Sequence, residues 1–366
     1  MRPRVLLVGH GAPTAGGIPS FLSDICEDEW LRGQVAVELL NTAPRWTKRP
    51  GRMTLRNLRQ AVGDARAVFT GARRCDVVHL NLAPAPLLPL LRAILLVGAA
   101  RFASSKVILH AHTGRLEKCA ARPLYRFFLR VCLRMTSAFV VVSAASDAAI
   151  RNLRATAVYL PNGIDVERIV PGLKDGAPPS IVFVGTVCER KGLLDLMNAL
   201  IEIRGGNDSL PARVLIIGDA RQEGPGVFER IQLRYADAGL DEVLFLGSVD
   251  RDRVREILGT AEIFCLPSHW EGSPLSLLEA MAAGAAIVAT NVGDVAHILE
   301  EGRDGILIKP HDVEALTRAL TTLLSDKECR IRLGTNARRR AEHSFARSAV
   351  TRRLYELYVE AARSRT

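Results

Sequence analysis

Short apolar runs alternate with stretches of helical periodicity along the whole chain, and this alternation predicts successive βα units. In the first half, the runs that we expect to be buried parallel strands are 5–8, 77–80, 107–110, 139–142 and 158–160. The pattern restarts after residue 180, with runs at 181–184, 214–217, 244–246, 263–266, 286–289 and 306–308. The chain is therefore predicted to be an α/β protein with two doubly wound domains.

The segment 170–180 has linker composition and divides the two series of strands. We place an N-terminal domain at residues 1–170 and a C-terminal domain at residues 171–346. Apolar residues at Leu354, Leu357 and Tyr358 predict a final helix within residues 347–366. Since ligands of doubly wound sheets bind beyond the carboxyl ends of the strands, functional residues are expected in the loops that follow them.

The composition indicates a cytoplasmic protein. Its seven cysteines are scattered, odd in number and without a C-x-x-C pair, as is typical of reduced thiols. The apolar stretch that follows Met1 is too short for a signal peptide, and the stretch 87–100 falls short of the ~20 residues of a membrane span. We therefore expect no transmembrane helix.

The net charge of +10 is unevenly distributed. Residues 1–170 hold 24 Lys/Arg and 11 Asp/Glu, a net charge of +13, whereas residues 171–366 hold 25 and 28, a net charge of −3. This asymmetry fits either an anionic partner of the first half or a generically basic composition.

The segment from Glu271 to Glu279 has the signals of a loop that leads into a short helix. Ser273 suits the N-cap, Pro274 suits the first helical position, and Gly284 suits the stop. The N-terminus of such a helix offers free N–H groups and partial positive charge to an anion. A nucleotide-sugar, with a diphosphate between two hydroxyl-rich rings, would match one carboxylate per ring. A capped surface helix with two solvated acids explains the same residues equally well.

Further segments occur in a fixed order along the chain. They are Gly16-Gly17-Ile18, His110-Ala-His112, Pro161-Asn-Gly-Ile-Asp165, Arg190-Lys191-Gly192 and Ser268-His-Trp-Glu271-Gly-Ser-Pro-Leu-Ser-Leu-Leu-Glu279-Ala-Met-Ala-Ala-Gly284. The ordered set resembles the signature of retaining, two-domain (GT-B) glycosyltransferases of family 4. The resemblance covers nearly the whole chain and is strongest from about residue 180 to residue 324.

This resemblance implies the GT-B fold, in which two Rossmann-like domains face each other across a cleft. It implies a hexosyltransferase-type enzyme that moves a sugar from a nucleotide-sugar, which we expect to be UDP-linked, with retention of configuration. The N-terminal domain would bind a saccharide or lipid-linked acceptor of polysaccharide or glycolipid synthesis, and the C-terminal domain would bind the donor. In this family the terminal helix crosses back to the first domain.

The resemblance also assigns roles in the first domain. It places Gly16 and Gly17 at the donor diphosphate, which only small residues allow to approach the backbone closely. His112 matches the family's catalytic histidine, which contacts the transferred sugar. From the residues alone, the glycines also fit a flexible loop, and His110 with His112 fits a structural pair.

In the second domain, Lys191 is expected to neutralise the leaving diphosphate with help from Arg190. An exposed basic loop is the alternative. Glu271 would bind hydroxyls of the transferred sugar and Glu279 the ribose. Ser273 and Leu275 would offer backbone N–H groups to the donor. Since cations and helix dipoles suffice and no D-x-D run is present, we expect no metal and no cofactor.

Three positions depart from the family pattern. Thr186 stands where the family usually has an arginine, and Asp294 and His297 replace a glycine and a glutamate. These departures leave two alternatives open, namely a nucleotide-sugar epimerase or hydrolase and a catalytically inactive sugar-nucleotide-binding protein.

Arginines recur every four residues in one predicted helix, at Arg122, Arg126, Arg130 and Arg134. The stripe fits either a solvated basic face or an interfacial helix at an anionic membrane surface, with the enzyme peripheral at the inner face of the cell membrane. A second basic stretch contains Trp46, Lys48, Arg49, Arg52, Arg56 and Arg59. No nucleic-acid recognition motif accompanies these charges, so no nucleic-acid partner is expected.

Overall fold

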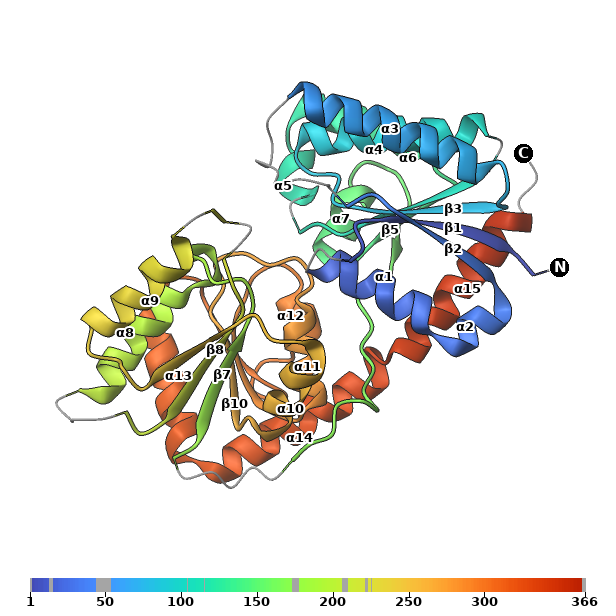
Figure 1. Ribbon diagram of the computed structural model, residues 1–366. Coiled ribbons are helices and arrows are strands. Elements are labelled where there is room, and N and C mark those ends of the chain that lie inside the picture. Colours follow the sequence, from blue (N-terminus) through green and yellow to red (C-terminus); the bar gives the residue numbers. More distant parts are fainter. Residues whose placement is uncertain are drawn as a thin grey trace. The chain divides into compact units, whose positions relative to one another are not determined.

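A computed structural model describes residues 2–12, 16–43, 54–103, 105–114, 116–172, 178–205, 210–220, 223–224 and 226–363. The chain forms two compact units (Figure 1). Unit 1 comprises Met1–Asn162 and Ser348–Thr366, and unit 2 comprises Gly163–Arg347. Both units contain a six-stranded, fully parallel sheet covered by helices, as expected of two Rossmann-like domains.

The sheet of unit 1 has the strand order β2-β1-β3-β4-β5-β6. Its strands are β1 (Arg4–Gly9), β2 (Ala36–Asn41), β3 (Val77–Leu82), β4 (Lys106–Ala111), β5 (Ala138–Val141) and β6 (Val158–Tyr159). All five expected strands are confirmed. The sequence pattern missed β2 because this strand lies at the sheet edge, is largely exposed and therefore carries no continuous apolar run.

Helices cover both faces of this sheet. On one face, α3 (Leu55–Ala72), α4 (Leu87–Phe102) and α6 (Pro123–Met135) contribute to a single apolar core together with α5 (Leu116–Ala120) and α7 (Ala144–Arg151). The other face is covered by α1 (Gly17–Glu27), α2 (Glu29–Gln34) and α15 (Arg347–Arg363). The terminal helix α15 thus belongs to unit 1, where it buries Val350, Leu354, Leu357 and Tyr358.

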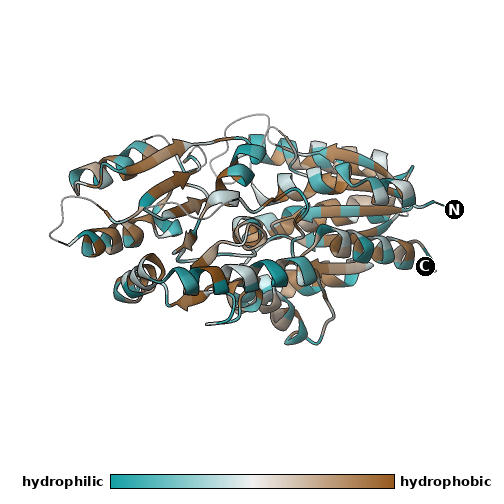
Figure 2. Cartoon of the chain, turned by 90° about the horizontal axis from the view of Figure 1, so that it is seen from below, coloured by the Kyte–Doolittle hydropathy of each residue, from teal (hydrophilic) through white to brown (hydrophobic). Residues whose placement is uncertain are grey.

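The sheet of unit 2 has the order β12-β11-β10-β7-β8-β9. Its strands are β7 (Ser180–Val184), β8 (Arg213–Ile217), β9 (Val243–Gly247), β10 (Ile263–Leu266), β11 (Ala286–Thr290) and β12 (Ile306–Ile308), which confirms all six expected strands. The helices are α8 (Leu193–Arg204), α9 (Val227–Asp237), α10 (Arg251–Thr260), α11 (Leu275–Ala282), α12 (Val295–Ile298), α13 (Val313–Ser325) and α14 (Lys327–Ser344). The strands of both units are mostly hydrophobic in Figure 2, as buried parallel strands must be.

The boundary between the units lies after Asn162, not at residue 170. The reason is that the segment after Asn162 already packs on unit 2. The Ile164 N–H donates to Phe345 O at 2.9 Å, and Val166 and Ile169 are buried in the core of unit 2.

Some of the sequence-based expectations lie outside the described residues. They concern part of the expected linker and four residues of the second basic stretch, Trp46, Lys48, Arg49 and Arg52. Among the described residues, no helix has the length and apolar character needed to cross a membrane.

Candidate active site

Lys191 and Glu271 form a largely buried ion pair at the carboxyl edge of the unit 2 sheet. Lys191 Nζ lies 2.5 Å from Glu271 Oε1, and the two side chains are 11% and 8% exposed. Ser268 Oγ donates to the same carboxylate oxygen at 2.6 Å. Lys191 follows β7 and Glu271 follows β10, and these strands are neighbours in the sheet. The sheet order therefore brings together two residues that the sequence separates by 80 positions.

Gly192 allows the loop that carries Lys191 to pack directly on the segment that leads to Glu271. Gly192 has φ 71°, and a Cβ atom there would lie 1.9 Å from the Pro267 carbonyl oxygen. The His269 N–H donates to Arg190 O at 2.9 Å, and the Arg190 guanidinium lies 5.4 Å from the centre of the Trp270 ring. Arg190 is thus held beside Lys191 rather than extended into solvent.

The helix α11 begins one residue later than expected. Pro274 is its N-cap, with extended backbone (φ −74°, ψ 114°), and no side chain caps the helix, so the assignment of Ser273 as N-cap was wrong. Leu275 is the first helical residue. Gly284 has φ 69°, which confirms its role as the left-handed stop. Pro274 has no N–H group, so the backbone donors at this end come from Ser273 and from Leu275 onward.

Glu279 lies in the second turn of α11, as expected, and its side chain is 13% exposed. Its Oε1 lies 3.7 Å from a guanidinium nitrogen of Arg251, a residue at the start of α10 that is 38% exposed. A partly solvated pair at this distance contributes little to stability. The place of Glu279 in the second turn of α11 is set by the helix, and the ion pair with Arg251 adds little to it.

The loop with the unusual Asp294 supports Glu271. Gly293 has φ 59°, and a Cβ atom there would lie 2.2 Å from the Glu271 carbonyl oxygen. The Asp294 N–H donates to Gly272 O at 3.0 Å, and the residue is fully buried. His297, by contrast, is exposed on α12. Asp294 thus replaces the family residue at a packed backbone contact, whereas His297 is open to solvent.

In unit 1, Gly16 and Gly17 stand where the loop after β1 enters α1. Gly16 is the N-cap of α1 with φ 133°, and nothing lies within 4 Å of a Cβ atom built at either glycine. The first turn of α1 carries no acidic residue. As far as the described residues show, no side chain covers this helix start, and no carboxylate in its first turn offsets its partial positive charge.

Three histidines lie close together beside α1: His79 within β3, His110 near the end of β4 and His112 just after β4. The ring of His110 lies 5.5 Å from that of His79 and 4.2 Å from that of His112, and the Phe21 ring of α1 lies 5.0 Å from that of His112. His112 Nε2 is hydrogen-bonded to Asn81 Oδ1 at 3.0 Å.

Burial lowers the pKa of His112 to about 3. Burial also lowers the pKa of His79 to about 3, and burial followed by repulsion from His112 and His79 lowers the pKa of His110 well below its usual value. His112 is therefore a neutral imidazole at physiological pH. Asn81, which is hydrogen-bonded to this ring, was not identified from the sequence, although it is the last residue but one of β3, as His110 is of β4.

The structure thus places the candidate residues in two groups. Arg190, Lys191, Glu271, Ser273, Leu275 and Glu279 gather at the carboxyl edge of the unit 2 sheet, and Gly16, Gly17 and His112 gather at that of the unit 1 sheet. The sequence did not predict a third group in unit 2, formed by Asp195, His269 and His311. Its signal was weak because the three residues come from three separate loops and helices.

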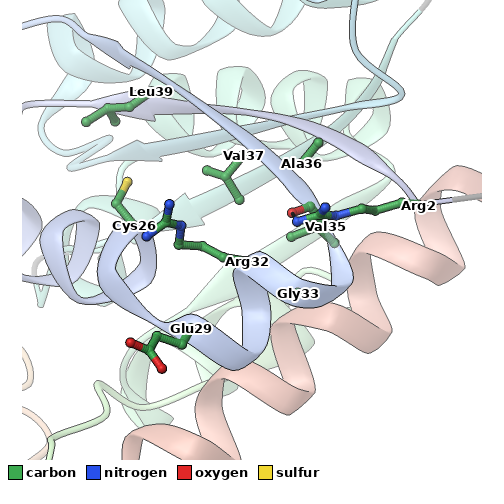
Figure 3. A pocket seen from close by; sticks show the side chains of 9 residues that line it. All are labelled: Arg2, Cys26, Glu29, Arg32, Gly33, Val35, Ala36, Val37 and Leu39. Atoms are coloured by element: carbon green, nitrogen blue, oxygen red, sulfur yellow. Dashed lines mark hydrogen bonds between the residues drawn. The ribbon is translucent and has the colours of Figure 1, made fainter.

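Unit 1 also has a surface hollow of about 500 Å³, which is separate from the groups of candidate residues (Figure 3). Its lining includes Arg2, Gly33, Val35 and Ala36, which lie at the amino ends of β1 and β2. Ligands of doubly wound sheets bind at the opposite, carboxyl edge. The hollow is therefore not the candidate active site.

Two parallel α/β units, with basic and acidic groups at the carboxyl edge of the second sheet, define a protein of the GT-B class. Residues 167–340 match the family model described as glycosyl transferases group 1, and residues 19–168 match the model described as glycosyltransferase family 4. The chain belongs to this group 1/family 4 of GT-B glycosyltransferases.

Individual relatives agree with this assignment. The chain is 30% identical over 214 residues to D-inositol 3-phosphate glycosyltransferase of Corynebacterium jeikeium, a match to 55% of this chain and 51% of that protein. The chain thus spans about half the length of that relative. It is 26% identical over 371 residues to the GDP-mannose-dependent α-(1-6)-phosphatidylinositol monomannoside mannosyltransferase of Mycobacterium tuberculosis, with 92% of each chain covered. The fold is similar to that of sucrose-phosphate synthase from Thermosynechococcus elongatus, with a TM-score of 0.79, 19% identity and coverage of 98% of this chain and 99% of that one.

Proposed function

We propose that the chain transfers a sugar from a nucleotide-sugar to a saccharide or lipid-linked acceptor with retention of configuration, in polysaccharide or glycolipid synthesis. The observation that carries this proposal is the largely buried Lys191–Glu271 pair next to the start of α11. The pair places one cation and one hydrogen-bond acceptor at the edge where a doubly wound sheet binds its ligand.

A diphosphate donor would redistribute the contacts of this pair. The Lys191 ammonium has three N–H donors, so it can bind a phosphate oxygen while it keeps a contact with Glu271. The other carboxylate oxygen of Glu271 accepts from hydroxyls of the transferred sugar. The N–H groups of Ser273 and Leu275 donate to the phosphates, and the carboxylate of Glu279 accepts from the ribose hydroxyls.

The transfer step then needs no external base. The bond between the anomeric carbon and the leaving phosphate oxygen breaks while the acceptor oxygen bonds to the same face of that carbon. The leaving diphosphate takes the acceptor's proton. Lys191, with Arg190 beside it, stabilises the charge that grows on the diphosphate as the bond breaks.

His112 would contribute as a neutral group. Burial keeps the imidazole of His112 uncharged at physiological pH. We therefore propose that His112 acts as a neutral hydrogen-bonding partner of the transferred sugar and not as a cation. A cation at this position would repel the oxocarbenium-like centre. A neutral ring held by Asn81 orients the sugar without that penalty.

The identity of the donor's nucleotide is the most specific part of the proposal. We expected a uridine-linked sugar, whereas the full-length mycobacterial relative is named as GDP-mannose-dependent. Incubation with UDP- and GDP-linked hexoses, with and without a phosphatidylinositol or saccharide acceptor, tests the function. Acceptor-dependent release of the nucleoside diphosphate supports transfer. Equal release without acceptor indicates a hydrolase, an altered sugar without release indicates an epimerase, and donor binding without turnover indicates an inactive binding protein.

Transfer is expected to persist in excess EDTA. Lys191, Arg190 and the N-terminus of α11 supply the positive charge that a Mg²⁺ ion would otherwise place on the diphosphate. At saturating donor, rates should therefore agree within about twofold with and without the chelator. Loss of transfer that Mg²⁺ or Mn²⁺ restores would contradict this metal-independent mechanism.

The helical layer of α3, α4 and α6 is proposed to dock on an anionic membrane surface. The three helices lie side by side, with α4 between α3 and α6 (Figure 1). Large apolar side chains are exposed on each of them: Leu55, Leu58, Val62 and Phe69 on α3, Leu88, Leu95 and Phe102 on α4, and Leu124 and Phe127 on α6. On α3 and α4 these positions share one helix face, which points away from the core.

The charge of this layer complements an anionic surface. The three helices contain eight arginines and a single acid, Asp64, which is paired with Arg92 at 2.6 Å. On α6, Phe127 is 60% exposed and shares the solvent side with Arg130 and Arg134, whereas Phe128 packs on the core. Exposed apolar side chains among arginines are typical of interfacial binding, at ~1 kcal/mol per cation near anionic lipid.

Replacement of Arg126 and Arg130 by Gln should weaken binding to anionic vesicles about tenfold or more, because it removes two of these cations. Co-sedimentation with phosphatidylserine and phosphatidylcholine vesicles, at low and high salt, measures the effect. Arg230→Gln with Arg234→Gln is a matched control, because these exposed arginines on α9 have the same spacing. Equal binding of both double variants, or equally negligible binding of the parent to both lipids, would overturn the docking proposal.

A further inference from the structure

One group of metal-ligating side chains lies outside the residues assigned so far. Asp195 is in the first turn of α8, His269 precedes α11, and His311 precedes α13. His269 Nε2 lies 2.8 Å from Asp195 Oδ2, His311 Nδ1 lies 3.8 Å from the same oxygen, and all three atoms lie within 4.8 Å of one another. Across the described part of the chain, no other three His, Cys, Asp or Glu side chains converge in this way.

From this arrangement we infer that Asp195, His269 and His311 form a binding site for a divalent transition-metal ion, with zinc as the ion that fits best. Zinc accepts imidazole nitrogen and carboxylate oxygen at about 2.0–2.2 Å. Tetrahedral bonds of that length place neighbouring ligand atoms about 3.3 Å apart. The two distances to Asp195 Oδ2 lie on either side of this value.

The remaining coordination position is supplied by the solvent. His311 is 66% exposed, whereas Asp195 and His269 are 17% and 24% exposed. Asp195 and His269 are thus held in place by the surrounding protein, whereas His311 binds the ion from the surface side. A water molecule is the fourth ligand. Mg²⁺ and Ca²⁺ prefer oxygen ligands, so a set with two imidazoles discriminates against them.

His311 has a backbone conformation that is unusual for a residue other than glycine, and this conformation directs its side chain toward Asp195 and His269. His311 has φ 66°, and the described residues contain only one other non-glycine residue with positive φ, Arg154. The His311 and His269 rings lie 3.8 Å apart, and the Asp195 carboxylate faces both. Without metal, the same contacts amount to a hydrogen bond from His269 Nε2–H to Asp195, so the two explanations differ in whether His311 binds an ion.

A bound ion would tie together three segments around the candidate active site. Asp195 follows the Arg190–Lys191 loop, and His269 lies between Ser268 and Glu271, with its N–H bonded to Arg190 O. With one carboxylate and two neutral imidazoles, the ion leaves a net charge of about +1 beside these residues. This consequence rests on the proposed function: zinc should lower the KM for the anionic donor without entering the chemical step.

The test measures zinc retention, which is independent of transfer. The full chain is dialysed against zinc, then against metal-free buffer, and its zinc content is determined with its melting temperature. The parent should retain about one zinc per chain and melt about 5 °C or more higher than without metal. Mg²⁺ should produce neither effect.

His311→Asn is the informative variant, because asparagine tolerates positive φ and lacks the imidazole. It should lose the retained zinc and the thermal shift, as should Asp195→Asn. His343→Ala is the control, since this exposed histidine on α14 lies outside the group. Failure of the parent to retain zinc, or equal retention by His311→Asn and the parent, would overturn the site, whatever the transfer assay shows.

A cobalt-substituted sample gives a second measurement. Cobalt bound by Asp195, His269 and His311 should show visible d–d absorption without a thiolate charge-transfer band. A strong thiolate band would show that one of the seven cysteines holds the ion and would also overturn the assignment.

Discussion

Replacement of Lys191 by alanine is expected to lower kcat about 10²–10³-fold, with a much smaller change in KM for the donor. Lys191 is a largely buried cation at the proposed diphosphate site, and the charge that it stabilises is largest when the sugar–phosphate bond breaks. An interaction of this kind is made mainly in the transition state. Arg190→Ala should be intermediate, because Arg190 lies next to Lys191 but contacts Trp270. Initial-rate kinetics at saturating acceptor measure these effects.

The structure shows why alanine alone is an ambiguous test. Removal of Lys191 leaves Glu271 buried without its cation, and removal of one partner of a buried pair costs about 3–5 kcal/mol of stability. The double variant Lys191→Met with Glu271→Gln removes both charges and keeps the volume. We expect it to restore the melting temperature of the parent but not the rate. A Lys191→Ala protein with activity within twofold of the parent would mean that the loop is merely basic.

Replacement of Glu279 by glutamine is expected to weaken donor binding about 10–100-fold, the effect of losing one charged hydrogen bond of about 1.5–3 kcal/mol. The melting temperature should change little, because the neighbouring Arg251 is partly solvated and 3.7 Å away. Titration calorimetry with the nucleotide-sugar, and with the nucleoside diphosphate alone, measures the affinity. Both ligands should lose affinity equally, since the ribose is common to them.

Glu256→Gln is the matched control for Glu279→Gln. Glu256 lies on the neighbouring helix α10, is exposed and pairs with an arginine as Glu279 does. It should leave donor affinity unchanged. Unaltered affinity in Glu279→Gln as well would refute the ribose assignment and favour a solvated helix acid.

The fold was largely predictable because its main signal is local. Eleven of the twelve strands are continuous apolar or half-apolar runs, since a parallel strand covered on both faces buries both sets of its side chains. The exception, β2, is exposed at the sheet edge, and Glu38 interrupts its apolar residues. The start of α11 was misplaced by one residue because serine before proline matches a cap pattern, although the backbone of Pro274 itself is extended.

The candidate site was predictable as a set of residues but not as a set of contacts. Arg190, Lys191, Glu271 and Glu279 were identified because each follows a strand of a doubly wound sheet and matches the family pattern. The pairing of Lys191 with Glu271 was not predicted, and the structure shows that the residues assigned to two parts of the donor contact each other. The role of Asp294 as a buried support for Gly272 was likewise hidden, because the sequence showed only a departure from the family.

The sequence by itself determined the two α/β units, the order of their strands along the chain and the residue types at their carboxyl ends. Hydrophobic periodicity and turn residues are properties of neighbouring positions, so no tertiary information is needed to recognise them. The spatial order of the strands was decided by the tertiary structure. It places β10 beside β7 and so joins Glu271 to Lys191, and it brings Asp195, His269 and His311 together from three separate segments. Burial among other histidines, which also depends on the tertiary structure, makes His112 neutral.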